Sequence, residues 1–282
     1  MISDVLNYFI NVRDRQRVSI ALSRGAAMMP ARKIDLTNPA TWEFSGFSQN
    51  GEDGILDVLR SQLKESNRYF IEIGVEDGIE CNTAWLVVAE KYSGIMIDGN
   101  AKLAKRANDF VFRYNIGAEC HHLFMKKDNV ERLKSLALHS DPDVFSLDVD
   151  GNDFYLAQAI LNSGFRPKIV AVEYNSAYGP HRSMTIEYDE EFVMAKAHPS
   201  QLYYGVSIAG WRTFFAKNGY RFVTVERRGV NAFFVDPTSF KPGFLSKIRG
   251  LKFAENQYQL MKFRKPSEEQ FALIASQRFV TI

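Results

Sequence analysis

Three carboxylates lie on one short turn in the stretch FSLDVDGNDF, residues 145–154. Asp148, Asp150 and Asp153 follow directly on an apolar run, as expected for acids at the end of a buried strand. Carboxylates this close repel one another unless a cation, hydrogen-bond donors or solvent offsets their charge. The turn therefore predicts either a metal site or a loop in which backbone amides hold the acids.

The next predicted strand, residues 168–175, ends in Glu173 and Asn175. Adjacent strands lie roughly 4.8 Å apart, so Asp148 or Asp150 would face these two side chains across a gap that one hard cation can bridge. Carboxylate and amide oxygens suit Mg²⁺, which can orient a substrate hydroxyl and lower its pKa. In the alternative interpretation, Asp153 caps the following helix and the other acids bond to loop amides.

Two other interpretations of this turn fit less well. A haloacid-dehalogenase-type phosphatase would use Asp148 in its D-x-D-G motif, but that motif usually lies on the first strand, and no convincing acidic pair follows it here. An EF-hand loop places a glycine sixth and a glutamate twelfth, whereas here Gly151 is fourth from Asp148 and Ala159 is twelfth.

Two earlier strand ends carry groups that suit a nucleoside ligand. The first reads EIGVEDG (72–78), in which Gly74 permits close backbone approach and Glu72 or Asp77 can accept hydrogen bonds from an ammonium group. Asp98 ends the next strand at about the interval where doubly wound nucleotide folds place an acid on ribose hydroxyls. The G-x-G-x-x-G fingerprint is missing, and an ordinary glycine turn is the alternative.

Alternating strands and helices must position these groups. Strands are predicted at 69–74, 94–99, 121–125, 144–150 and 168–175, and helices at 52–65, after Asn82, from about 101, at 129–138 and at 153–162. Apolar strands separated by amphipathic helices favour a parallel sheet covered on both faces. A helix within 203–219 and a hairpin of strands 220–226 and 230–236 follow. We therefore predict an α/β fold, with a doubly wound, seven-stranded, Rossmann-like sheet whose last hairpin is antiparallel.

The chain divides into a predicted N-terminal helical extension (1–43), a main domain (44–236) and a basic C-terminal extension (237–282). The first eighteen residues resemble an amphipathic helix, which the segment with Pro30, Pro39 and Trp42 cannot continue. The basic residues between 241 and 265 form either a docking surface for an anionic substrate or a solvated face.

Composition limits the partners and the compartment. The 35 basic and 33 acidic residues leave a net charge of +2, which indicates no nucleic-acid partner. Cys81 and Cys120 are too few for a disulfide framework, which favours a reducing compartment, and we expect a soluble cytoplasmic protein without a membrane span. His181, in the polar loop after the fifth strand, is a candidate general base.

These features together resemble the FkbM-type family of S-adenosylmethionine-dependent methyltransferases, especially its members found among bacterial surface-polysaccharide genes. The matching segments lie between about residues 44 and 236 and are FSQNGEDGIL, FIEIGVEDGIECNT, GIMIDGN, FSLDVDGNDFYL, VAVEYN, YYGVSIAGW and GYRFVTVERRGVNAFFV. The resemblance implies a class I methyltransferase fold in which Glu72, Gly74 and Asp98 bind the donor, while Gln49 and Glu52 close over its methionine end. Related sugar O-methyltransferases hold Mg²⁺ with acids that end strands four and five, which here are Asp148 or Asp150, Glu173 and Asn175.

The predicted activity is O-methyl transfer from S-adenosylmethionine to a sugar, nucleotide sugar or polysaccharide, with Mg²⁺ assistance left open. Asp150, Glu173 and His181 are the candidate catalytic residues. The alternatives are a cofactor-binding module without turnover and a magnesium-dependent phosphatase that uses Asp148. The sequence determines neither the acceptor nor whether the protein forms a homo-oligomer.

Overall fold

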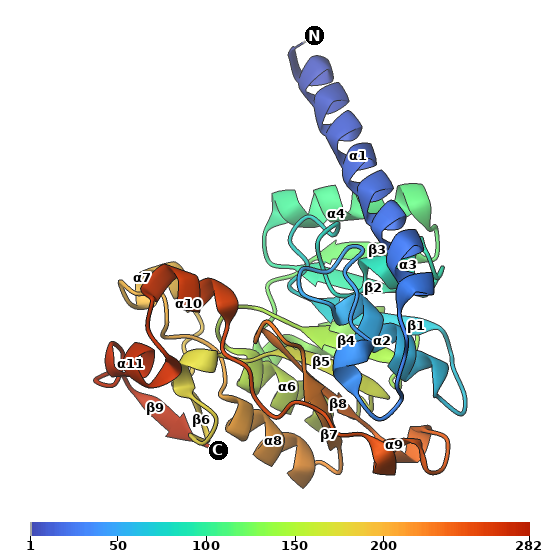
Figure 1. Ribbon diagram of the computed structural model, residues 1–282. Helices are drawn as coiled ribbons and strands as arrows, with labels where there is room; N and C mark the ends of the chain where they lie inside the picture. Colours follow the sequence, from blue (N-terminus) through green and yellow to red (C-terminus); the bar gives the residue numbers. More distant parts are fainter. Residues whose placement is uncertain (1) are drawn as a thin grey trace.

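Seven strands form one sheet in the order β3-β2-β1-β4-β5-β8-β7 in the computed structural model, which describes residues 2–282 and the side chains from residue 12 onward (Figure 1). Strands β1 to β5 run parallel, β8 is antiparallel to β5, and β7 is antiparallel to β8. The strands are β1 (Tyr69–Ile73), β2 (Ser93–Asp98), β3 (Ala118–His122), β4 (Val144–Leu147), β5 (Ile169–Glu173), β7 (Arg221–Val225) and β8 (Asn231–Val235). This is the strand order of class I methyltransferases, so the predicted fold class and its final antiparallel hairpin are confirmed.

Helices cover both faces of the sheet. Residues of α2 (Glu52–Ser61), α3 (Ala84–Val88) and α4 (Ala101–Tyr114) share one apolar core, and residues of α5 (Val130–Leu136), α6 (Asp153–Asn162) and α8 (Ile208–Lys217) share another. Consecutive residues of β1 alternate between the two, because side chains of a strand point to opposite faces. Phe70 belongs to the first core, and Ile71 and Ile73 belong to the second. With both faces covered, the loops lie at the ends of the strands. The switch point of the sheet, at which the order of the strands reverses, lies between β1 and β4.

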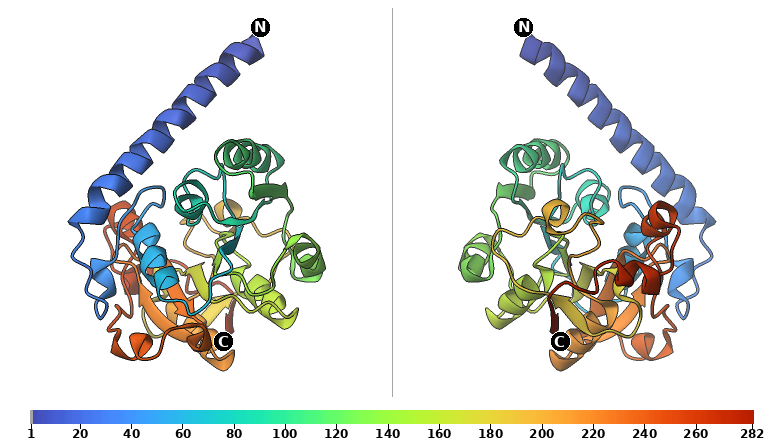
Figure 2. Two further views of the ribbon diagram at one scale, coloured as in Figure 1. Left: turned by 90° about the vertical axis from the view of Figure 1, so that its right-hand side faces the viewer. Right: turned by 90° about the vertical axis from the view of Figure 1, so that its left-hand side faces the viewer.

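Helix α1 (Ile2–Ala31) projects from the body as a long rod (Figures 1 and 2). The expectation that Pro30 could not continue this helix is wrong, because a proline in the last turn forfeits only one backbone hydrogen bond. The predicted amphipathic character rests mostly on side chains of residues 1–11, which lie outside the described part. None of the described helices is both long and apolar enough to span a membrane.

The predicted strands all differ from the observed ones by one or more residues, and the differences at β3 and β4 affect the cleft. Strand β3 lies three residues earlier than expected, because its pairing with β2 places His121 beside Ile97. The apolar residues Leu123 to Met125 leave the sheet and line a cleft instead. Strand β4 ends at Leu147, before the acidic turn, where Asp150 has a left-handed backbone with φ of 54°.

The polar segment after β5 and the C-terminal extension combine into a third apolar core, which the sequence analysis missed. It includes Tyr178, Ile186, Leu202 and Ile274. The elements around it are β6 (Met184–Ile186), paired with β9 (Phe279–Thr281), and the short helices α7 (Met194–Ala197), α10 (Gln257–Phe263) and α11 (Ser267–Ala272). Figure 1 shows them grouped beside the sheet, away from β2 and β3. A further short helix, α9 (Phe244–Lys247), packs against the first core.

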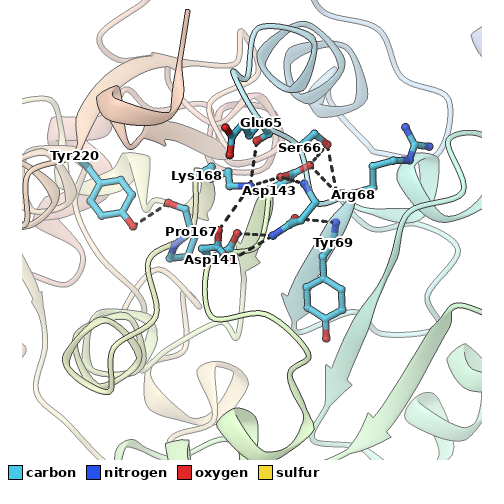
Figure 3. Close-up of polar contacts among 10 residues, drawn as sticks. Glu65, Ser66, Arg68, Tyr69, Asp141, Asp143, Pro167, Lys168 and Tyr220 are labelled. Atoms are coloured by element: carbon cyan, nitrogen blue, oxygen red, sulfur yellow. Dashed lines mark hydrogen bonds and ion pairs between the residues drawn. The ribbon is translucent and has the colours of Figure 1, made fainter.

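A buried ion pair joins β4 and β5 at their amino ends (Figure 3). Lys168 Nζ lies 2.9 Å from Asp143 Oδ1 and donates to the carbonyl of Glu65 at 3.1 Å. The Asp143 carboxylate also accepts from the backbone N–H groups of Asn67 and Arg68. The charges of this cluster are therefore paired with one another. The cluster lies at the amino ends of the strands, opposite the acidic turn at their carboxyl ends.

Candidate active site

One cleft of about 1000 Å³ lies over the carboxyl ends of β1, β2, β4 and β5. Its walls also include residues 192–195, 200–202, 204, 256–259 and 261–263 from the third core region. The charged residues in its lining are the acids Glu52, Glu72, Glu76, Glu80, Asp98, Asp148, Asp150 and Glu173, and the bases Arg228 and Lys262. Acidic residues outnumber basic ones in this lining by eight to two, which favours cationic ligands over anionic ones.

The loop after β1 passes directly over the end of β4. Gly74 has φ of 87°, and a Cβ atom at this position would stand 1.5 Å from the carbonyl oxygen of Asp148. Only glycine satisfies both the backbone conformation and this approach. Gly74 thus brings the predicted donor loop next to the acidic turn.

Asp98 holds the loops that follow β1 and β2. Its Oδ2 accepts from the backbone N–H of Glu76 at 2.9 Å, and its Oδ1 accepts from that of Asn100 at 2.7 Å. Each carboxylate oxygen retains a further lone pair. Because Asp98 lines the cleft, it can still accept hydrogen bonds from ligand hydroxyls, as its predicted role at a ribose requires.

Glu72 and Asp77, the two predicted acceptors for an ammonium group, have different surroundings. Glu72 lines the cleft, but its carboxylate accepts from the backbone N–H groups of Asn82 and Thr83 at 2.9 and 3.0 Å, and burial raises its pKa. Asp77 lies outside the lining, with its Oδ2 2.6 Å from Arg17 on α1 and 3.3 Å from Arg106 on α4. These two guanidinium groups hold the Asp77 carboxylate outside the cleft lining, a geometry that does not favour its predicted contact with the donor.

Gln49 and Glu52 both line the cleft at the start of α2. Glu52 is buried, and its two oxygens accept from the side-chain amide of Asn231 at 2.9 Å and from the backbone N–H of Asn50 at 2.8 Å. Gln49 is exposed to the cleft. Glu52 thus fixes this end of the cleft, and Gln49 is the side chain that can adjust to a ligand.

Three acids from two strands meet at the other end of the cleft. Carboxylate oxygens of Asp148, Asp150 and Glu173 lie within 4.8 Å of one another. Burial, followed by repulsion from the neighbouring acids, raises the pKa values of Asp148 and Glu173 well above their usual range. Oxygen ligands at this spacing suit a hard divalent cation, and the cluster brings together three of the four predicted ligands.

Asp153 explains how the turn places these acids side by side. It is the first residue of α6, and its carboxylate accepts from the backbone N–H groups of Val149 and Gly151, both at 2.9 Å. Asn152 occupies the N-cap position. Asp153 therefore accepts hydrogen bonds from the loop amides that, in the alternative interpretation, would bond to Asp148 and Asp150.

Asn175 and His181 do not join the cluster. The Asn175 side chain donates to the carbonyls of Leu202 and Tyr204 at 2.7 and 3.0 Å and accepts from the N–H of Ala177 at 3.0 Å. It is fully buried, and its side chain positions the 202–204 segment, a geometry that does not favour its predicted role as a metal ligand. His181 is exposed and lies outside the described lining of the cleft, which removes the geometric basis for its role as the base.

Two residues near Glu173 were missed by the sequence analysis. Tyr204 lines the cleft, and its hydroxyl lies 3.3 Å from Glu173 Oε1. Gln259 of α10 donates to the same hydroxyl at 3.2 Å. Tyr204 lies in the matching segment YYGVSIAGW, but nothing in that segment shows that it reaches Glu173, and Gln259 lies in none of the matching segments. Both reach the site only through contacts between segments distant in the sequence.

No protein-family model matches the chain, and no curated protein sequence matches it. Among solved structures, it is similar to an O-methyltransferase from Bacillus cereus in complex with SAH, at 15% identity over 78% of this chain and 89% of that one, with a TM-score of 0.44. It is also similar to a putative O-methyltransferase from Klebsiella pneumoniae, at 14% identity over 64% and 74% of the two chains, with a TM-score of 0.39. A SAM-dependent methyltransferase from Aquifex aeolicus matches at 12% identity over 63% and 86%, with a TM-score of 0.38. These values are too low to carry an argument about activity, and FkbM membership stays a prediction.

Proposed function

We propose that the protein is an O-methyltransferase that uses S-adenosylmethionine as donor and a hydroxyl of a sugar, nucleotide sugar or polysaccharide as acceptor, with assistance from Mg²⁺. The observation that carries this proposal is the cleft itself, in which eight acids face two bases over the strand ends of a class I sheet. The donor carries a sulfonium and an ammonium group, so its charge complements this lining. An anionic group would meet repulsion over the acids of the strand ends, and Arg228 and Lys262 are the lining residues that could accommodate it.

The donor would lie over β1 and β2. Asp98 accepts hydrogen bonds from the ribose hydroxyls, since its oxygens line the cleft and retain free lone pairs. Gly74 lines the cleft and keeps the loop after β1 packed against the Asp148 carbonyl, which places the donor loop beside the acidic turn. Gln49 and Glu52 enclose the methionine end.

The acceptor hydroxyl would lie at the acidic cluster. Asp148, Asp150 and Glu173 would hold the cation, which when bound lowers the pKa of the hydroxyl. Transfer breaks the S–CH₃ bond and forms an O–CH₃ bond, and alignment of the two reactants supplies much of the rate. Asp150 is the exposed member of the cluster, so we assign it the transfer of the hydroxyl proton to solvent.

The helix α10 offers a wall for the acceptor. Tyr258 and Met261 line the cleft although they are 66% and 71% exposed, and a ring surface of this kind suits packing against a sugar. Lys262 and Arg228 beside them suit the phosphate of a nucleotide sugar. We expect Tyr258→Ala to raise the KM for the acceptor while leaving that for the donor unchanged.

The test combines donor binding with methyl transfer. S-adenosylhomocysteine should raise the Tm, and radiolabel should pass from S-adenosylmethionine to a pool of sugars, nucleotide sugars or glycans. EDTA, Asp150→Asn and Glu173→Gln should each abolish transfer while donor binding persists. Asp109→Asn, which removes an exposed acid of α4 outside the cleft lining, is the matched control. Full transfer in EDTA and in both variants would make these acids structural.

The same experiments separate the alternatives. Tight binding of S-adenosylhomocysteine with persistent absence of transfer would favour a binding module. Metal-dependent release of phosphate that Asp148→Asn abolishes would favour the phosphatase. Absence of any Tm shift with millimolar S-adenosylhomocysteine would refute the methyltransferase.

A further inference from the structure

Tyr204 lies at the junction between the acidic cluster and the C-terminal extension. It is buried at 4% exposure, two residues after Leu202 and three before the N-cap of α8 at Ser207. Its hydroxyl is 3.3 Å from Glu173 Oε1 and 3.2 Å from Gln259 Nε2. A phenol keeps its proton near neutral pH, so this hydroxyl has one proton to donate and lone pairs with which to accept.

The C-terminal extension sets the direction of these hydrogen bonds. The backbone N–H of Asn256 donates to Ser176 Oγ at 2.9 Å, and Ser176 Oγ donates to Gln259 Oε1 at 3.2 Å. The amide nitrogen of Gln259 then faces Tyr204. The reverse orientation of the Gln259 amide would take away Oε1 as the acceptor of the Ser176 hydroxyl proton, so the observed orientation satisfies this group.

This direction has a consequence for Glu173. Because Gln259 donates to the Tyr204 hydroxyl, the tyrosine proton is left for Glu173 Oε1, which must act as an acceptor. The main chain of Glu173 is held as well, since Trp211 Nε1 donates to its carbonyl at 2.7 Å. One oxygen of the carboxylate is thereby fixed, and a neutral donor stands among three acids that repel one another.

We propose that Tyr204, oriented by Gln259, is a positioning residue that holds the Glu173 carboxylate where it can share a divalent cation with Asp148 and Asp150. This inference rests on the proposed function, in which these acids bind the cation. A partner that orients a metal ligand typically contributes 10- to 100-fold to metal affinity, and we expect an effect of about this size. Tyr204 itself does not touch the cation.

The test uses the full chain, Mn²⁺ as a paramagnetic substitute for Mg²⁺, and S-adenosylhomocysteine as a separate readout. Tyr204→Phe removes only the hydroxyl and should raise the Kd for Mn²⁺, measured by electron paramagnetic resonance, about 10- to 100-fold. The Kd for S-adenosylhomocysteine should not change. Gln259→Met leaves Tyr204 in place but removes the donor that orients it, and should weaken Mn²⁺ binding in the same direction.

Tyr178→Phe is the matched control. Tyr178 is also fully buried and donates its hydroxyl to the carbonyl of Tyr204 at 2.7 Å, so its loss perturbs the same segment without touching Glu173. Its Kd for Mn²⁺ should equal that of the wild type even if its Tm falls. If Tyr204→Phe does not fold, Gln259→Met decides the question.

Two results would overturn the inference. Wild-type Mn²⁺ affinity in Tyr204→Phe, or in Gln259→Met where Tyr204→Phe does not fold, would show that Glu173 needs no such support. Absence of Mn²⁺ binding in the wild type would show that the three acids bind no such cation, and hence that Tyr204 positions no metal ligand. Binding of S-adenosylhomocysteine in the same samples would then show whether the donor half of the proposed function still stands.

Discussion

Asp53 is a buried acid whose protonation makes the free energy of unfolding of the protein depend on pH. It is 1% exposed, and its Oδ2 accepts from the backbone N–H groups of Gly46, Phe47 and Ser48 at 2.7, 2.7 and 3.0 Å. Its Oδ1 is buried without a hydrogen-bond partner among the described residues. Burial raises the pKa of Asp53 from 3.8 to about 7, although the three amides lower it. We infer that Oδ1 carries a proton below that pH.

The sign of the effect follows from the raised pKa. The folded protein binds this proton more tightly than the unfolded chain does, so the contribution of Asp53 to stability is fully present below about pH 4 and is lost as the pH rises through about 7. Between pH 5 and pH 7 the unfolded chain has already released the proton. With up to about 1.4 kcal/mol per pH unit, and less near the folded pKa, the loss over this interval is about 2 kcal/mol.

The substitution Asp53→Asn tests this reasoning, since it keeps one oxygen for the three amides and removes the titration. We expect the wild type to lose about 2 kcal/mol of unfolding free energy relative to the variant between pH 5 and pH 7, measured by urea titration. Asp109→Asn, at an exposed acid, should leave the pH dependence as it is. A difference between wild type and Asp53→Asn that is constant or grows with pH would show that the three amides outweigh burial and keep Asp53 ionised.

Three further predictions concern the two ends of the sheet. Asp98→Ala should raise the Kd for S-adenosylhomocysteine about 10- to 100-fold by calorimetry, because it removes hydrogen bonds to a charged acceptor, and an unchanged Kd would place the ribose elsewhere. Gly74→Ala should destabilise the protein by about 3 kcal/mol or more in urea, since its Cβ would meet the Asp148 carbonyl at 1.5 Å and φ is 87°. Lys168→Met should cost about 3 kcal/mol because it leaves the buried Asp143 without its cation, and the folded variant should still bind S-adenosylhomocysteine normally.

The strand ends were predictable because they depend on local patterns. An apolar run that ends in an acid identified Asp98 and Asp148, and parallel strands bring such ends to one edge of the sheet. The proximity of Asp150 and Glu173 followed from the same geometry and is present in the structure. Local sequence patterns therefore predict well which side chains lie together at the carboxyl ends of the strands.

The partners of those side chains were not predictable, because they come from distant segments. Asp77 follows a strand just as Asp98 does, but α1 and α4 supply the guanidinium groups that turn it away from the cleft. Asn175 looks like a ligand in the sequence, yet its amide satisfies backbone groups at 202 and 204. Short elements such as α10, which lines the cleft, and β9, which pairs with β6, contain too few residues for a periodic signal, so the sequence pattern did not predict them.

The two ends of the cleft consequently depend on different parts of the chain. At the donor end, Asp98 takes its amide partners from residues 76 and 100, in loops that the sheet itself positions. At the acidic end, Glu173 is reached by Tyr204 and, through it, by Gln259 of the C-terminal extension. Since side chains without shared partners contribute nearly independently, changes in α10 should affect the acceptor end and spare the donor end. The C-terminal extension, which the sequence predicted to be either a docking surface or a solvated face, thus also reaches Glu173 through Tyr204.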